Sequence, residues 1–228
     1  MIKRKVLVLC FLCFSINTIT AKIENRISKN GIVVEFINED QSVNDSIVKL
    51  YLDTFFQVYP KLSKEYNKEA IKQIKIKIES EYTGVAYAHN GQITISAKWM
   101  KNNPYDADLI THEAMHIVQQ YPGGSSPGWL VEGVADYARF KFGLNNDLAK
   151  WSLPKWKEGS HYTNSYRVTA KFLVWISKTY NKKIVKLLDK EMRLNNYSAA
   201  LWKNYTNKSL DELWDEYAKI SGHTELKY

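Results

Sequence analysis

His112 and His116, with Glu113 between them, constrain this chain more than any other feature, because their spacing suits a helix. On a helix, residues four apart lie one above the other on the same face, so both imidazoles can reach one cation. Zn²⁺ binds imidazole nitrogens at about 2.0–2.1 Å. The carboxylate of Glu113 would then face a water beside the metal and could act as its general base. The segment therefore predicts a metal-binding helix near the middle of the chain.

The flanks of this motif also favour a helix. Asn103 suits an N-cap and Pro104 the first helical position, and Asp106 and Asp108 would follow in the first turn. The pattern ends at the strong breaker Tyr121-Pro-Gly-Gly124. We therefore expect the histidines to lie in the middle of a helix that begins near residue 104.

A second helix should follow, with Ser126 as its N-cap and Pro127 next. Glu132 and Asp136 are again four residues apart on a segment that is otherwise apolar. Burying two carboxylates is costly unless a cation compensates them. A catalytic zinc takes three protein ligands and keeps one open position, so we expect Glu132 to be the third ligand. Asp136 would then orient one histidine through its other ring nitrogen, and the reverse assignment stays open.

Three other interpretations also stay open. The histidines could cap or hydrogen-bond on a solvated helix face. Glu132 and Asp136 could be exposed charges, paired with Arg139 at a spacing of three residues. A purely structural zinc would need four protein ligands, and Asp136 is the spare candidate. The two helices together favour a catalytic metal site over each of these.

Four blocks in order resemble the basic secretory protein family of plants, zincin peptidases with bacterial members. The blocks are His112-Glu-Ala-Met-His-Ile-Val-Gln119, Pro127-Gly-Trp-Leu-Val-Glu-Gly-Val-Ala-Asp-Tyr-Ala-Arg139, Ser165-Tyr-Arg-Val-Thr-Ala-Lys-Phe-Leu173 and Leu210-Asp-Glu-Leu-Trp-Asp-Glu-Tyr217. Where family members carry Gly-Tyr, this chain has Ser165-Tyr166, so the tyrosine is kept. The resemblance implies a secreted metallopeptidase fold and says less about the substrate.

The expected fold class is α+β and zincin-like, with a small mixed sheet, an antiparallel edge hairpin packed on the active-site helix, and a helical C-terminal half. Periodicity predicts its elements. Strands are expected at 32–37 and 73–79, the second with one wet face, and a hairpin at 85–89 and 92–97 around Asn90-Gly91. Helices are expected at 45–59, where Pro60 ends the pattern, then at 64–72, 165–180, 182–193 and 198–205, and after a capping box at Ser209.

Two segments have an open role. In zincins an extended peptide can pair with the sheet edge, which implies that Tyr87 to Ser96 includes the substrate-facing edge. A plain hairpin without a ligand role is the alternative. The irregular stretch 143–163 is rich in tryptophan and follows the second metal helix. It could wall a cleft or pack onto the core.

Residues 1–21 are typical of a secretory signal peptide, with basic residues at positions 3–5 and an apolar run too short to span a bilayer. Cys10 and Cys13 both fall within it, so the mature chain would have no cysteine. Removing it leaves 207 of 228 residues, predicted to form one domain, residues 22–228. The net charge falls from +8 to +5, because three basic and no acidic residues are lost. The remaining lysines are scattered, which argues against nucleic-acid binding, and no stable membrane insertion is expected.

The expected function is peptide-bond hydrolysis by a secreted or periplasmic peptidase. His112, His116 and Glu132 would hold Zn²⁺, and Glu113 would act as general base. Tyr166 is the first candidate to stabilise the oxyanion, and His161 is the second. Helical spacing also allows Tyr166 a role in core packing. A secreted binding protein that keeps a zincin scaffold without turnover is the rival function.

Overall fold

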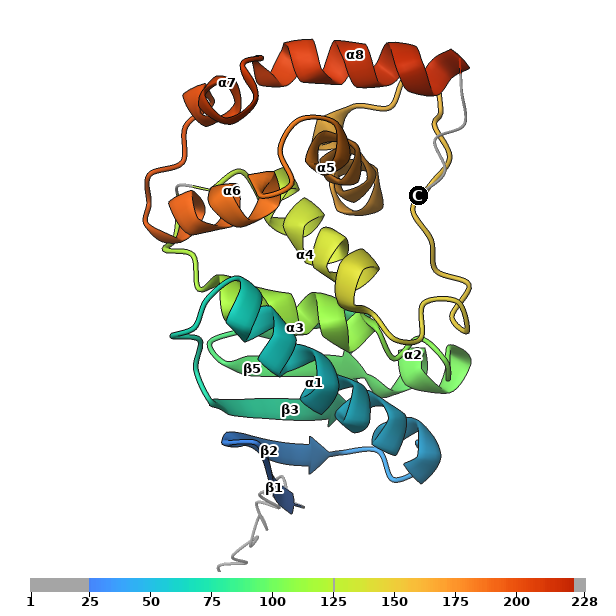
Figure 1. The fold of residues 1–228 in the computed structure, drawn as a ribbon. Coiled ribbons are helices and arrows are strands. Elements are labelled where there is room, and N and C mark those ends of the chain that lie inside the picture. The colour runs from blue at the N-terminus through green and yellow to red at the C-terminus, as the bar shows by residue number, and fades with distance from the viewer. Residues whose placement is uncertain (1–24, 125, 224–228) are drawn as a thin grey trace, which may run out of the picture.

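The computed structural model describes residues 25–124 and 126–223 (Figure 1). The predicted signal peptide, residues 1–21, lies outside this described part. A five-stranded sheet has the order β1-β2-β3-β5-β4. Its strands are β1 (Asn25–Lys29), β2 (Ile32–Asn38), β3 (Gln73–Glu79), β4 (Ala86–His89) and β5 (Gln92–Ser96). The three inner strands are parallel, and both edge strands are antiparallel to their neighbours. The expected mixed sheet with an edge hairpin is therefore confirmed.

One face of the sheet is apolar and the other is polar. Ile74, Ile76 and Ile78 of β3 are at most 2% exposed and contribute to the core. On the opposite face, Lys75 pairs with Glu35 at 3.4 Å, as strand alternation requires. The wet face expected for this strand is therefore present.

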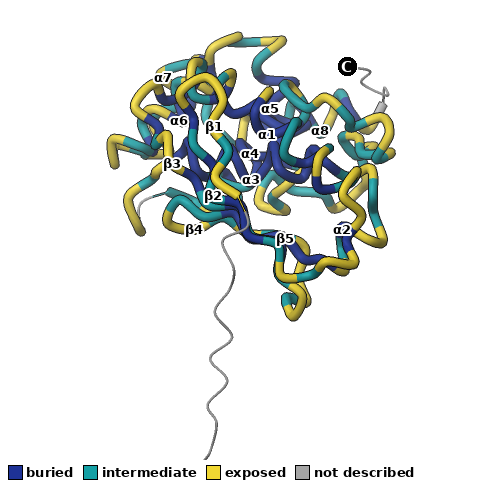
Figure 2. Tube along the Cα trace, turned by 90° about the horizontal axis from the view of Figure 1, so that it is seen from below, coloured by how far each residue is buried: buried dark blue, intermediate teal, exposed yellow. Residues whose placement is uncertain are grey.

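The helices lie on the apolar face of the sheet. They are α1 (Asp45–Glu65), α2 (Ala97–Asn102), α3 (Leu109–Gln119), α4 (Gly128–Phe142), α5 (Tyr166–Thr179), α6 (Ile184–Arg193), α7 (Ala200–Thr206) and α8 (Leu210–His223), with a short 3₁₀ turn η1 (Tyr162–Asn164) before α5. In Figure 1, α1 and α3 lie against the sheet, α4 lies beyond α3, and α5 to α8 form the next part. The buried residues gather around α1, α3, α4 and α5 (Figure 2). The helical C-terminal half is confirmed.

Two helix predictions were wrong at the end of α1. Helix α1 continues through Pro60 to Glu65. The burial of Leu62 and of the preceding turn stabilises this extension by more than the one backbone hydrogen bond that proline removes. The helix expected at 64–72 is absent, since Tyr66 is the C-cap of α1 and strand β3 begins at Gln73.

The start of the histidine helix was also misplaced. Asn103 is the C-cap of α2, and α3 begins at Leu109 instead of Pro104. Helix α2 itself was not anticipated; the Ser96 hydroxyl accepts a hydrogen bond from the Trp99 backbone N–H at 3.3 Å and caps it. His112 and His116 still lie within one helix, so their predicted stacking on one face holds.

Two further local signals are present in the structure. Strand β1 forms a hairpin with β2 around Asn30-Gly31, both with positive φ, which sequence reasoning missed because β1 is polar and mostly exposed. The capping box of α8 is confirmed, because the Ser209 N–H donates to Glu212 and the Glu212 N–H donates to the Ser209 hydroxyl. Among the helices of the described ranges, each is too short or too polar to cross a bilayer.

Candidate active site

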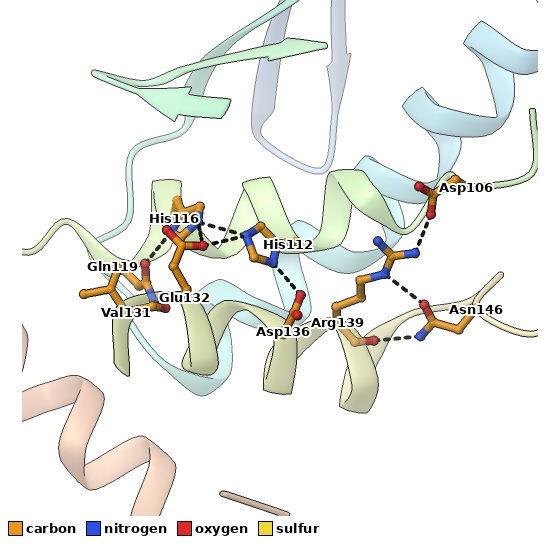
Figure 3. Close-up of polar contacts among 9 residues, drawn as sticks. All are labelled: Asp106, His112, His116, Gln119, Val131, Glu132, Asp136, Arg139 and Asn146. Atoms are coloured by element: carbon orange, nitrogen blue, oxygen red, sulfur yellow. Dashed lines mark hydrogen bonds and ion pairs between the residues drawn. The ribbon is translucent and has the colours of Figure 1, made fainter. Parts of the chain in front are cut away.

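Helices α3 and α4 bring three potential metal ligands together (Figure 3). Nε2 of His112 lies 3.1 Å from Nε2 of His116 and 3.2 Å from Oε2 of Glu132. Nε2 of His116 lies 3.4 Å from the same carboxylate oxygen. One possible metal-ligand atom from each of these three residues lies within 4.8 Å of the other two. The predicted ligand set is therefore adjacent in space as well as in pattern.

The other nitrogen of each imidazole is held by a partner. Nδ1–H of His112 donates to Asp136 at 2.7 Å, and Nδ1–H of His116 donates to Oε1 of Gln119 at 2.7 Å. The amide Nε2 of Gln119 donates in turn to the backbone carbonyl of Val131 on α4 at 3.0 Å, which fixes the amide orientation. Sequence reasoning missed Gln119; its only signal was the i+3 spacing from His116.

These hydrogen bonds decide which nitrogens carry protons. When Nδ1 of a neutral imidazole donates, Nε2 presents a lone pair. Two such lone pairs and a carboxylate oxygen then converge within 3.4 Å. This arrangement is repulsive unless a proton or a metal cation lies between these atoms, and nitrogen and oxygen donors in this number suit Zn²⁺. The residues present therefore fit the metal.

The pKa values of the metal-free cluster follow the same electrostatics. Burial disfavours the charged form of His112, but hydrogen bonds to Asp136 and Glu132 outweigh it and raise the pKa of His112 to about 10. Burial likewise opposes the charged form of Glu132, yet its bonds to both histidines hold the pKa of this carboxyl well below its usual range. The surrounding carboxylates thus favour positive charge at the convergence of the donor atoms.

Glu113 follows His112 on α3 and interacts electrostatically with all three cluster residues, but one of its oxygens has no hydrogen-bond partner. Its side chain is 4% exposed, and Oε2 is buried without a partner. Burial raises the pKa of Glu113 above its usual value, partly offset by His112 and His116. A carboxyl that is buried, unpaired and higher in pKa can accept a proton and release it again.

Tyr166 stands at the start of α5, over the first histidine. Its ring is stacked on that of His112, with centroids 6.0 Å apart and planes at 16°. The side chain is 55% exposed, so the alternative of core packing was wrong. Both Ser165 (φ 69°, ψ −177°) and Tyr166 (φ 47°) have positive φ, and the Ser165 conformation is one that glycine alone adopts readily.

His161, the second candidate for the oxyanion, is placed elsewhere. Its Nδ1 accepts from the Thr163 backbone N–H, and its ring packs against Tyr162 and Trp214 at 4.0 and 5.6 Å between centroids. It does not line the cavity at the histidines. This candidate was wrong, because the 3₁₀ turn directs the ring toward α8.

The alternative in which Glu132 and Asp136 are exposed charges paired with Arg139 is wrong, because Arg139 has other partners. Arg139 is 4% exposed, forms an ion pair with Asp106 and donates to Asn146 at 3.1 Å. Its guanidinium lies 4.5 Å from the ring centroid of Trp151. Arg139 therefore ties the loop after α4 to the segment before α3.

A cavity of about 1820 Å³ contains the cluster. Strand β4 lines one side of it, so the predicted hairpin lies at the edge beside the site. Residues 148–151 of the irregular stretch also line it, whereas Trp156 packs on Trp214 and Tyr217 with centroids 5.7 Å away in both cases. The stretch thus walls the cavity with its first part and packs on the core with its second.

Comparisons with known proteins give one family match and several distant structural likenesses. A search of curated proteins found no match. Among solved structures, the chain is similar to a two-domain M1 zinc metallopeptidase mutant bound to L-tryptophan, and to the M1 zinc metallopeptidase of Deinococcus radiodurans. In each case the identity is 12% and the TM-score is 0.46. The match covers 90% of this chain and 51% of the first structure, and 89% and 52% for the second.

A TM-score of 0.46 is too low to assign the fold by likeness, and the chain spans about half the length of these structures. The sequence profile of one family, described as a peptidase of plants and bacteria, matches residues 18–217, which include all four blocks noted above. The chain belongs to this family of peptidases.

Proposed function

We propose that this chain is an exported, zinc-dependent peptidase whose metal is held by His112, His116 and Glu132. The observation that carries the proposal is the convergence of their three electron-rich atoms, with the buried carboxyl of Glu113 interacting electrostatically with the same three residues. Asp136 contacts the Nδ1 side of His112, away from this convergence, which supports a role in orienting the ring. The site then has three protein ligands and an open position, as catalytic zinc requires.

Bound zinc would lower the pKa of a water in the open position and polarise the scissile carbonyl. The residues of the chain supply the proton transfers. Glu113 accepts a proton from the attacking water while the oxygen of that water bonds to the carbonyl carbon. The same carboxyl then delivers the proton to the amide nitrogen as the C–N bond breaks, giving an acid and an amine.

Tyr166 is the proposed donor to the developing oxyanion. Its ring lies against His112, and its exposed position leaves the hydroxyl free to meet a substrate. The nearby carboxylates, Glu132 first, raise the pKa of Tyr166, so the phenol keeps its proton and can donate it in a hydrogen bond.

Strand β4 offers a place for the substrate backbone. It is the edge strand of the sheet and lines the cavity. An extended peptide can add to such an edge through main-chain hydrogen bonds. Export rests on the signal-like residues 1–21, whose cleavage would release the domain outside the cytoplasm.

The test compares purified wild type with Glu113→Gln on casein, with and without a chelator. Both proteins should carry one equivalent of zinc, since Glu113 is not a ligand. The variant should lose at least about 100-fold in rate, the contribution typical of a general base, and the chelator should abolish wild-type activity. Glu69→Gln, at an exposed glutamate outside the cavity, is the matched control. Equal or absent cleavage in wild type and Glu113→Gln would favour a binding protein instead.

A further inference from the structure

Exposed large apolar side chains gather in the cavity beside the zinc-ligand cluster. Of the seven such side chains among the described residues, five line this cavity: Val85, Tyr87, Tyr105, Leu148 and Tyr166. Leu148 is 61% exposed and Tyr105 is 59% exposed. Exposed apolar surface concentrated in one place marks a binding site more often than chance exposure does. The binding partner should therefore present apolar side chains.

These side chains come from separate segments of the chain that line the same cavity. The Val85 carbonyl accepts a hydrogen bond from the Ser96 N–H at 3.0 Å, at the end of β5 where α2 begins. The loop that carries Tyr105 follows α2, so this loop and the start of β4 lie toward the start of α3. Trp99 and Trp151 also line the cavity and add aromatic surface.

Each of the four carboxylates of the described cavity lining has either a role in the proposed chemistry or a partner within the protein. Glu132 belongs to the ligand cluster and Asp136 binds Nδ1 of His112, whereas Glu113, whose Oε2 has no hydrogen-bond partner, is the proposed general base. Asp106, the remaining acid in this lining, accepts hydrogen bonds from Arg139 and from the indole N–H of Trp99. A free N-terminus would therefore have to compete with the proposed metal, with His112 or with Arg139 for a carboxylate.

A C-terminal carboxylate also lacks a dedicated partner. Arg139 is engaged by Asp106 and Asn146. The other cations of the described lining, Lys150 and Arg167, are exposed at the surface, and Arg167 donates to the Ser152 carbonyl at 3.3 Å. Ion pairs between exposed groups contribute little, about 0–1 kcal/mol. The lining therefore selects neither end of a peptide.

We propose that the site takes an internal, extended segment of a polypeptide, with a large apolar side chain held against Tyr105 and Leu148. The protein is then an endopeptidase that cleaves beside bulky apolar residues; this rests on the proposed function above. The cavity volume of about 1820 Å³ supports the proposal. It exceeds the roughly 300–1000 Å³ of sites for single small molecules, so it can hold several residues.

The first experiment offers the zinc-loaded enzyme a mixed library of peptides, each with free ends or with acetylated and amidated ends, and maps the cleaved bonds by mass spectrometry. Blocked and free peptides should be cut at similar rates, at bonds beside Phe, Tyr, Leu or Met. Cleavage restricted to peptides with one free end would overturn the endopeptidase assignment. Cleavage without preference for apolar residues would overturn the apolar assignment. In both outcomes the proposed peptidase would stand.

Variants then test the two apolar side chains of the cavity lining that are proposed to contact the substrate. Tyr105→Ser and Leu148→Ser should each lower kcat/KM on apolar peptides by about tenfold, the effect of losing a modest apolar contact, and leave kcat/KM on serine-rich peptides nearly unchanged. Leu194→Ser is the matched control, because Leu194 is 54% exposed outside the cavity. Equal values for all three variants would overturn the proposal.

A binding measurement separates this inference from turnover. Glu113→Gln should bind a blocked phenylalanine-rich peptide more tightly than a blocked serine-rich one, as followed by the change in tryptophan fluorescence, since Trp99 and Trp151 line the cavity. Tight apolar binding without any cleavage by wild type would refute the proposed function and keep the binding preference. Equal binding of both peptides would refute the preference.

Discussion

Gln119 gives the sharpest test of how the site is held. Replacing it by leucine removes the acceptor for Nδ1–H of His116, at 2.7 Å, and the donor to the Val131 carbonyl, at 3.0 Å. Gln119 is 2% exposed, so water cannot readily replace either bond. The ring of His116 would lose both its orientation and the partner that keeps its lone pair on Nε2.

The expected effect follows from the role of such outer partners. Their loss usually weakens metal affinity by about 10- to 100-fold, or about 1.4–2.7 kcal/mol. The unpaired Val131 carbonyl should also lower the free energy of unfolding by about 1–3 kcal/mol. Gln119→Glu keeps an acceptor for His116, so its zinc affinity should lie closer to that of wild type, although the bond to Val131 is still lost.

The assay is competition for zinc against a chromophoric chelator, at a pH where wild type is folded with and without metal. Gln57→Leu, on an exposed position of α1, is the matched control and should leave the zinc affinity unchanged. If Gln119→Leu binds zinc within twofold of wild type while circular dichroism shows the native fold, the proposed coupling from α4 through Gln119 to His116 is refuted.

Three further predictions concern stability, each measured by urea unfolding. Gly133→Ala places a Cβ 2.2 Å from Cγ2 of Thr169 and should cost about 1–3 kcal/mol, and Thr169→Ser should recover part of it; an unchanged midpoint would contradict this close helix contact. Ser165→Gly should stabilise by about 1 kcal/mol by relieving the φ of 69°, and a lower stability would argue against strain there. Lys101, bonded to Asp40 at 2.8 Å, lowers the pKa of Asp40 from 3.8 to about 2; stability gained above pH 3.8 is therefore lost as pH falls toward 2. Asp40→Asn should flatten that loss, and an identical acid profile would contradict the assignment.

The ligand cluster could be predicted because its information is local. The spacing of four residues places His112 over His116, and Glu132 over Asp136, on any helix. Only the docking of α3 on α4 was not local, and the cost of leaving buried carboxylates without a cation indicated it. Gln119 could not be assigned in this way, because its partner Val131 lies on another helix.

Helix ends were harder to predict, since one signal fits two structures. Asn103 before Pro104 suits an N-cap, but it equally suits the residue that ends α2. Pro60 predicts a helix end locally, yet tertiary burial of the next turn extends α1. Tyr166 was placed correctly at a helix start, but neither its positive φ nor its stacking on His112 can be read from spacing.

The bonds behind the two imidazoles have a consequence for how the protein would acquire its ion. Asp136 orients the ring of His112 and Gln119 orients that of His116. Gln119 is itself held by the backbone carbonyl of Val131 on α4. The two rings are thus oriented by the fold, so zinc could bind to the already folded protein. Protein folded without zinc should therefore be fully reconstituted when the ion is added later, without passing through an unfolded state.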